Sequence, residues 1–112
     1  MDCLFCKIAE GEIPSKKFYE DDTVLAFYDI DPKAPVHFLV IPKEHIPSLT
    51  AIDAGNSAVV AHIYEVIAKL SRSPGFEKGY RVVSNCGEDA GQSVPHIHFH
   101  VLAGRPLAWP PG

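Results

Sequence analysis

An unbroken alternation of imidazole and apolar side chains constrains this chain more than any other feature. Residues 96–102 read His-Ile-His-Phe-His-Val-Leu. Successive side chains of a β-strand point to opposite faces of its sheet, so His96, His98 and His100 would share one face. We therefore expect a strand over His96–Leu102 whose apolar residues pack on a core and whose histidines line the opposite face.

The neighbouring imidazoles restrict the chemistry of that face. Three adjacent imidazolium charges would repel one another, so most of these histidines are expected to be neutral at pH 7. His37, on another expected strand, is placed to join them. The residues alone leave three interpretations open: a polar sheet face, a zinc hydrolase site that uses two histidines and a third ligand, and a covalent nucleophile that attacks phosphorus.

A polar loop with two glycines, Gly87–Val94, precedes the histidines. Gly91 permits close approach of a backbone, while Gln92 and Ser93 offer amide and hydroxyl donors. Donors of this kind stabilise an anionic oxygen as its charge develops. The loop therefore favours chemistry on a phosphate over a plain polar surface.

The remaining segments predict a small α+β fold. Asp2 is expected to cap a short helix over Cys3–Glu10, and Asp53 to cap one long helix that ends at Ser73-Pro74-Gly75. Asp29–Pro35 reads as a loop stiffened by its prolines. Further strands are expected at Lys17–Glu20, Val24–Tyr28, His37–Ile41 and Tyr80–Ser84. Short connections predict an antiparallel sheet that the long helix covers on one face.

Length and charge narrow the class of protein. The chain has 112 residues, as expected for one domain, and a net charge of −4. That charge argues against a nucleic acid polymer or an anionic membrane surface as a partner, although it permits a mononucleotide. No apolar run approaches a membrane span, no secretory signal is visible, and the three cysteines fit a reducing compartment. We expect a cytoplasmic, single-domain protein.

These motifs resemble a known family. His96–Leu102 matches the His-x-His-x-His-apolar-apolar signature of the histidine triad (HIT) superfamily. The Gly91-Gln92-Ser93-Val94 loop and the tail Trp109-Pro110-Pro111-Gly112 make the chain similar to the Hint branch, the nucleotide-binding purine nucleoside phosphoramidases. The resemblance covers nearly every residue. It implies a HIT-like antiparallel sheet of about five strands with one long helix and a short N-terminal helix, in a two-fold dimer with a continuous sheet.

The resemblance also implies a reaction, hydrolysis of the P–N bond of purine nucleoside 5′-phosphoramidates such as adenosine phosphoramidate or AMP-lysine, with aminoacyl adenylates as a further type of substrate. His98 matches the nucleophile that forms a nucleotidyl-histidine, and AMP or GMP would be released. His37, His96 and His100 match its supporting histidines, while Ser93 matches the residue near the departing amine. No cofactor is expected for catalysis. A dinucleotide hydrolase or nucleotidyl transferase of the superfamily, and a nucleotide-binding regulatory module with incidental turnover, are the alternatives.

Nucleotide contacts follow from the same resemblance. Asp29 matches the carboxylate that accepts the ribose hydroxyls, although its local sequence alone fits an Asx turn before Pro32. Asn85 and Gln92 match polar positions around ribose and phosphate, beside the close approach that Gly91 allows. The apolar walls of the base pocket match residues that composition alone would place in a core: Phe5, Ile8, Ile13 and Phe27.

Two segments are expected at a homodimer contact. The helix face formed by Val59, Ile63 and Val66 fits either pairing of protomers or the chain's own core. Residues 105–112 are expected to form an arm, stiffened by prolines, in which Trp109 reaches the site of the partner protomer. A lone exposed tryptophan without such a role is the alternative.

The pair Cys3-x-x-Cys6 departs from animal Hint enzymes. Many bacterial histidine triad proteins have it, and there it binds zinc with two histidines whose positions match His45 and His96. Residues i and i+3 of a helix face the same way, and two thiolates with two imidazoles form a closed, structural zinc site. Two buried thiols without a metal are the other interpretation, since a redox pair lacks its thioredoxin-like context. Cys86 has no visible partner.

Overall fold

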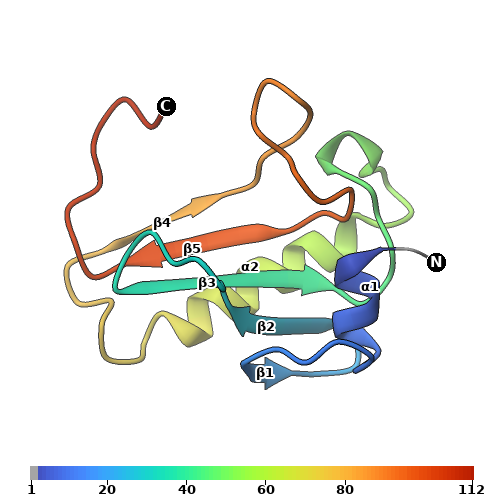
Figure 1. Ribbon diagram of the computed structural model, residues 1–112, viewed down its shortest axis with the longest axis horizontal. Coiled ribbons are helices and arrows are strands. Elements are labelled where there is room, and N and C mark those ends of the chain that lie inside the picture. The colour runs from blue at the N-terminus through green and yellow to red at the C-terminus, as the bar shows by residue number, and fades with distance from the viewer. Residues whose placement is uncertain (1–2) are drawn as a thin grey trace.

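The computed structural model describes residues 3–112 as a five-stranded sheet with a helix on each face (Figure 1). In chain order the elements are α1 Leu4–Ala9, β1 Lys17–Glu20, β2 Val24–Tyr28, β3 Val36–Pro42, the 3-10 turn η1 Leu49–Ala51, α2 Ser57–Leu70, β4 Tyr80–Val83 and β5 Phe99–Ala103. The expected α+β fold is confirmed. No helix within residues 3–112 is long and apolar enough to cross a membrane.

The sheet has the strand order β1-β2-β3-β5-β4, and each neighbouring pair is antiparallel. In the register of β3 with β5, His37 lies opposite Leu102 and Leu39 opposite His100. Since side chains alternate along both strands, His37, Leu39 and His100 share one face of the sheet. The register therefore brings together histidines that lie 63 residues apart in the sequence.

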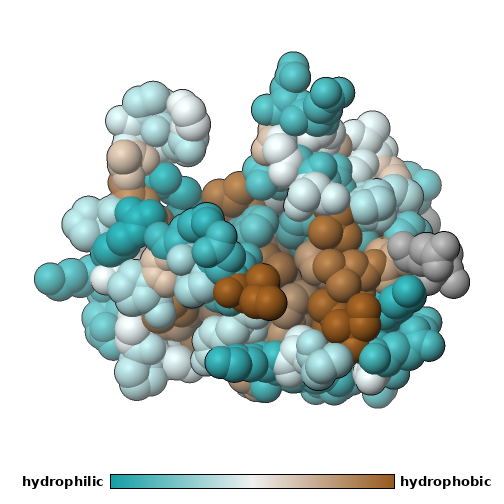
Figure 2. Space-filling model, viewed as in Figure 1, coloured by the Kyte–Doolittle hydropathy of each residue, from teal (hydrophilic) through white to brown (hydrophobic). Residues whose placement is uncertain are grey.

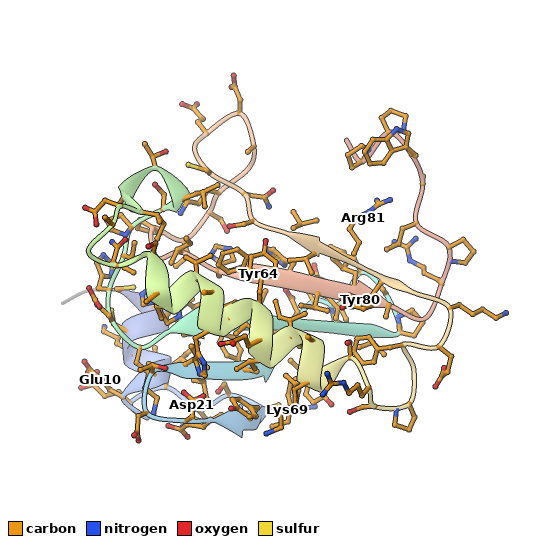
Figure 3. All side chains as sticks on the ribbon, turned by 180° about the vertical axis from the view of Figure 1, so that it is seen from behind. Glu10, Asp21, Tyr64, Lys69, Tyr80 and Arg81 are labelled. Atoms are coloured by element: carbon orange, nitrogen blue, oxygen red, sulfur yellow. The ribbon has the colours of Figure 1, made fainter. Side chains whose placement is uncertain are left out.

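The opposite face carries the main core, which α2 covers. Phe99, Val101 and Ala103 of β5 are buried there, as the alternation predicted. Figure 3 shows α2 running across the strands, with Tyr64 labelled on it. Ile63 and Val66 of α2 are also buried in this core, and Val59 packs against it. The helix face formed by Val59, Ile63 and Val66, for which a dimer contact and the core were both possible, therefore lies in the chain's own core.

A second, smaller cluster lies on the histidine face, under α1. Phe5, Cys6 and Ile8 pack there against Leu25 and Phe27 of β2, together with two residues of β3. An isolated helix of six residues is unstable in water because its nucleation cost is not recovered. The helix α1 is therefore stabilised by the contacts of its buried side chains with β2 and β3.

The last strand differs from the expectation. It begins at Phe99 rather than His96 and ends at Ala103. The His96 N–H donates to the Val94 carbonyl, and the Ile97 N–H donates to the Ile46 carbonyl at 2.6 Å. These local and loop-directed hydrogen bonds take the backbone of residues 96–98 out of the sheet ladder. The first triad histidine consequently lies on a turn that leads into β5.

Two predicted helix caps also require correction. Asp2 lies outside the described residues, and the N-cap of α1 is Cys3, whose Sγ accepts the Cys6 N–H at 3.4 Å. The long helix begins at Ser57 after Asn56, whereas the predicted cap Asp53 accepts the Gly55 N–H within the preceding turn. The strand β4 ends one residue earlier than expected, at Val83.

Candidate active site

A cavity of about 1110 Å³ opens on the sheet face that carries α1. Figure 2 shows hydrophobic side chains gathered in this hollow, with hydrophilic residues around its rim. The apolar part of the lining includes Phe5, Ile8, Ile13, Phe27 and Leu39. The polar part includes Asp29, His37, Asn85, Ser93, His98 and His100, and the backbone at Gly91 also reaches the cavity. One end of the cavity is thus apolar and the other is polar.

Most of the residues predicted to act in catalysis or to bind substrate line this cavity, but three of them do not. Gln92 instead braces its own loop, where its Oε1 accepts the Gly87 N–H and its Nε2 donates to the carbonyls of Pro47 and Val94. The Trp109 side chain is 80% exposed and lies against Arg81, with 5.8 Å from the guanidinium carbon to the ring centre. His96 is completely buried beneath the cavity.

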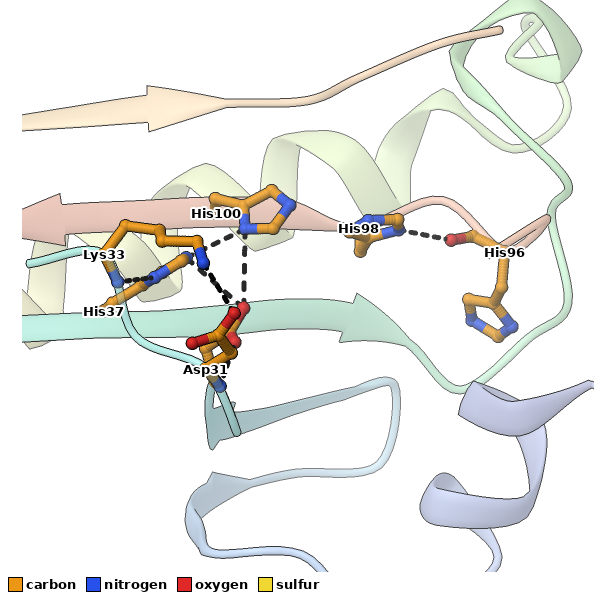
Figure 4. A network of polar contacts seen from close by, with 7 residues as sticks. Asp31, Lys33, His37, His96, His98 and His100 are labelled. Carbon is orange, nitrogen blue, oxygen red and sulfur yellow. Dashed lines mark hydrogen bonds and ion pairs between the residues drawn. The ribbon is translucent and has the colours of Figure 1, made fainter. Parts of the chain in front are cut away.

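His96 positions His98 through its backbone. The Nδ1 of His98 lies 2.8 Å from the His96 carbonyl oxygen (Figure 4). Because a carbonyl only accepts, Nδ1 carries the proton of the neutral ring, and Nε2 is left with a lone pair. The His98 ring is 5% exposed and lines the cavity, with its edge against the Phe5 ring. A buried, oriented imidazole with an unprotonated nitrogen is suited to nucleophilic attack.

The tautomers of His37 and His100 are fixed by a second chain of hydrogen bonds (Figure 4). The backbone N–H of Lys33 donates to His37 Nδ1 at 3.0 Å, so Nε2 of the neutral His37 ring carries its proton. His37 Nε2 lies 2.9 Å from His100 Nδ1, which must therefore accept the hydrogen bond that the His37 Nε2–H donates. The neutral His100 ring is therefore protonated on Nε2, beside His98, whose ring centre is 5.1 Å away.

Burial keeps these imidazoles neutral. It lowers the pKa of His37, although the carboxylate of Asp29 opposes the effect. Burial, together with the nearby His98 and His37, lowers the pKa of His100 to about 4. Both rings are therefore uncharged at pH 7, as the alternation of histidines predicted.

Asp29 lies beside the histidines, and its two carboxylate oxygens make different contacts. Its Oδ1 accepts the Asp31 N–H at 2.8 Å, as in an Asx turn. Its Oδ2 lies 3.4 Å from His37 Nε2 and 3.9 Å from His100 Nδ1. Oδ1 of Asp29 thus stabilises the turn of the loop, while Oδ2 faces His37 and His100.

A cluster of four metal-ligating residues joins α1 to the histidine segment. Cys3 Sγ lies 3.3 Å from His96 Nδ1, and Cys6 Sγ lies 3.3 Å from His45 Nδ1 and 3.5 Å from His96 Nδ1. His96 Nε2 donates to the Pro42 carbonyl at 2.8 Å, which leaves the Nδ1 lone pair facing the sulfur atoms. All four donor atoms lie within 4.8 Å of one another, in the set that the sequence predicted.

Sequence reasoning missed several residues of the cavity. Leu39 lines it and could have been found, because it shares the strand face of His37 at a spacing of two. Ile30 stands at the rim fully exposed, and only a resemblance to related sequences could have marked it. Ser15 also lines the cavity, and its buried Oγ has no hydrogen-bond partner within the described part of the chain. The backbone donor at Lys33 carries no signature in the sequence.

Comparison with known proteins places this geometry in one family. The model of the HIT domain matches residues 10–107. An uncharacterized HIT-like protein of Synechococcus elongatus is 47% identical over 111 residues, which are 99% of this chain and 97% of the relative. A crystal structure of a HIT family hydrolase from Legionella pneumophila is 48% identical with a TM-score of 0.96, covering 99% of this chain and 100% of that one. A zinc-bound histidine triad family protein from Mycobacterium smegmatis is 39% identical with a TM-score of 0.80, covering 94% and 76%.

Proposed function

The chain belongs to the HIT domain family, and we propose that it is a nucleoside phosphoramidase of the Hint branch with His98 as a covalent nucleophile. Its substrates would be purine nucleoside 5′-phosphoramidates, with AMP or GMP as the product. The observation that carries the proposal is the hydrogen bond from His98 Nδ1 to the His96 carbonyl, because it leaves Nε2 unprotonated in the cavity. The likeness to a HIT family hydrolase supports the reaction class.

The reaction divides into two displacements at phosphorus. His98 Nε2 attacks the α-phosphorus, an N–P bond to the imidazole forms, and the bond to the amine nitrogen breaks. The Ser93 hydroxyl, at the polar end of the cavity, is the donor that we assign to the departing amine. Water then attacks phosphorus, the N–P bond to His98 breaks, and the nucleoside monophosphate leaves. His100 Nε2–H stabilises the charge on the phosphoryl oxygens in both steps.

The two ends of the cavity fit the two ends of a nucleotide. Phe5, Ile8, Ile13 and Phe27 form an apolar slot that suits a purine ring. Asp29 Oδ2, which lies 3.4 Å from His37 Nε2, would accept hydrogen bonds from the ribose hydroxyls. The slot offers stacking with few polar groups, so a preference between adenine and guanine would be modest.

The cysteine and histidine cluster fits a structural zinc ion. Tetrahedral coordination with Zn–S and Zn–N bonds of ordinary length separates sulfur from nitrogen by about 3.6 Å. The sulfur to nitrogen distances of 3.3 and 3.5 Å are close to that value. Cys3, Cys6, His45 and His96 would fill all four positions, so the ion would serve the fold rather than activate water. The zinc-bound relative supports this assignment.

Trapping of the intermediate tests the proposal. Adenosine 5′-phosphoramidate is mixed with the protein, and the reaction is quenched with base within milliseconds to seconds. Intact and peptide mass spectrometry should find one AMP on His98. His98→Ala should lose both the adduct and turnover, whereas His62→Ala, which changes a histidine outside the cavity, should keep both. Turnover in His98→Ala at the wild-type rate would contradict the proposal.

A metal-dependent hydrolase is the second candidate, because Asp29, His37 and His100 form another set of possible metal ligands. Their donor atoms also lie within 4.8 Å of one another. A hydrolase of this kind would lose activity on chelation and would form no adduct. A panel of dinucleotides and phosphoramidates separates the remaining HIT activities, and nucleotide binding without turnover would indicate a regulatory module.

The dimer and the cytoplasmic location remain part of the proposal. Among the described residues 3–112, the edge strand β4 pairs only with β5, so its other edge has unpaired backbone groups with which a second copy could pair. Sedimentation at micromolar protein concentration tests the homodimer directly. Cross-linking from Trp109 would then show whether the arm formed by residues 105–112 reaches the partner's cavity.

A further inference from the structure

The hydrogen bonds that fix two of the cavity histidines begin in the C-terminal arm. Arg105 lies just after β5, and its Nε–H donates to the Lys33 carbonyl at 3.0 Å. The N–H of the same Lys33 donates to His37 Nδ1 at 3.0 Å, and His37 Nε2 lies 2.9 Å from His100 Nδ1. Lys33 therefore links two sets of hydrogen bonds, one from the arm to its carbonyl and one from its N–H to the histidine pair that lines the cavity.

The guanidinium of Arg105 is itself held in place. Its Nη1 donates to the Pro106 carbonyl at 2.9 Å, so the planar group bridges the arm and the loop. The adjacent Gly104 lies so close to the loop that a Cβ there would stand 2.9 Å from Pro35 Cβ. Gly104 and Arg105 thus contact the loop 29–35 at consecutive positions. Gly104 packs closely on Pro35, and Arg105 forms a hydrogen bond.

The loop has few other restraints at Lys33. Among residues 3–112, the exposed Lys33 side chain forms an ion pair with the exposed Asp31. Exposed ion pairs of this kind are weak and hold a backbone poorly. Within residues 3–112, Arg105 is the one side chain that donates to the Lys33 carbonyl. The Lys33 carbonyl and the Lys33 N–H belong to two successive peptide groups that meet at the Lys33 Cα, so Arg105 anchors the residue whose N–H reaches His37.

We infer that Arg105 is a positioning residue that sets the tautomers of His37 and His100. By holding the Lys33 carbonyl it directs the Lys33 N–H at His37 Nδ1, which places the His37 proton on Nε2 and the His100 proton on Nε2, toward the phosphoryl oxygens. The effect on catalysis rests on the proposed phosphoramidase activity. The effect on the tautomers does not, and it can be measured without substrate.

Loss of the Lys33 contact would release the tautomer of His37. When no N–H occupies Nδ1, the single proton of the neutral ring can lie on either nitrogen. With that proton on Nδ1, Nε2 would accept rather than donate, which reverses the direction of the bond to His100.

Arg105→Ala tests the inference with two readouts. In ¹⁵N histidine NMR spectra, wild-type His37 should show the neutral Nε2–H form at pH 7, and Arg105→Ala should show exchange between tautomers. The loss of about one hydrogen bond predicts a five- to tenfold lower kcat and a KM changed less than twofold. Arg105→Lys keeps a donor and should recover part of both effects.

Two further variants keep the test decisive. Arg81→Gln changes the other arginine beside the arm, which contacts the Trp109 ring and not the loop (Figure 3), so its histidine spectra and kcat should match the wild type. Lys33→Pro removes the N–H itself, and it should reproduce the His37 change if Arg105→Ala fails to fold. Wild-type histidine signals and a wild-type kcat in a folded Arg105→Ala would overturn the inference. An absence of phosphoramidate turnover in the wild type would contradict the proposed function alone.

Discussion

Removal of the proposed zinc ligand Cys6 should loosen the N-terminal helix and weaken nucleotide binding together. The substitution is Cys6→Ser, with Cys86→Ser as the matched control because Cys86 lies outside the four-residue cluster. Without a metal, burial, together with the neighbouring Cys3, raises the pKa of the Cys6 thiol to about 11, so that thiol stays protonated at pH 7. Zinc uptake should therefore release protons, which a weakly buffered titration detects.

The size of the effect follows from linkage and chain length. Free zinc at about one hundred times its dissociation constant stabilises the folded state by about 2.7 kcal/mol. The entropy of unfolding of 112 residues is about 0.24 kcal/mol/K, from about 2.1 cal/mol/K per residue. The zinc-loaded wild type should consequently melt about 11 °C above Cys6→Ser. Because Phe5 and Ile8 of α1 line the cavity, AMP binding should weaken about tenfold in that variant.

Three measurements check this prediction. Elemental analysis should find one zinc per wild-type chain and per Cys86→Ser chain, and little in Cys6→Ser. Calorimetry gives the difference in melting temperature, and titration with AMP gives the difference in affinity. The reasoning is refuted if Cys6→Ser retains zinc at one per chain, or if zinc-loaded and chelated wild type melt together and bind AMP equally.

Three other perturbations address groups with distinct roles. Asp21, in the turn before β2, accepts hydrogen bonds from the N–H groups of Thr23 and Val24 and lies 2.7 Å from His62 Nε2 of α2 (Figure 3). Asp21→Ala should cost about 2–3 kcal/mol in urea unfolding, and a loss below 0.5 kcal/mol would show that the turn needs none of these bonds. Ser15→Ala should weaken AMP binding about fivefold and leave ribose 5-phosphate binding unchanged, if the unpartnered hydroxyl meets the base; equal effects on both ligands would exclude that contact. The pKa of His100 is lowered to about 4 by burial and its neighbours, so the unfolded chain binds more protons between pH 6.5 and 4. Stability should thus fall as pH decreases through this window, by up to about 3 kcal/mol, and His100→Asn should lose less than the wild type; identical losses would contradict the assignment.

The sequence predicted the faces of the strands better than their ends. Alternation alone placed Phe99 and Val101 in the core beneath α2, because side-chain direction is a local property of a strand. The start of that strand depends on the hydrogen bond from Ile97 to Ile46, which lies 51 residues away in the sequence and leaves no local pattern. The cap of α2 shifted from Asp53 to Asn56 for a similar reason, since both residues are good caps and the turn between them decides.

In the candidate site, likewise, some features could be predicted from the sequence and others could not. The resemblance located His98, Asp29 and the apolar walls, because these positions are defined by residue type. The resemblance could not show that the side-chain amide of Gln92 donates to the carbonyls of Pro47 and Val94, because several loop conformations are compatible with the same sequence. It also could not show backbone donors such as Lys33, because every residue except proline carries an N–H.

The contact between Cys3 and His96 joins residues separated by 93 positions, almost the length of the chain. During synthesis α1 leaves the ribosome well before the histidine segment. Contacts of such long sequence separation require closure of a large loop, which slows folding relative to local contacts. The apolar contacts of α1 with β2 and β3 need no residue beyond Pro42 and can form earlier. The cluster of Cys3, Cys6, His45 and His96 is completed only after residue 96 has been made, so a nascent chain that stalls before it would hold α1 by its apolar contacts alone.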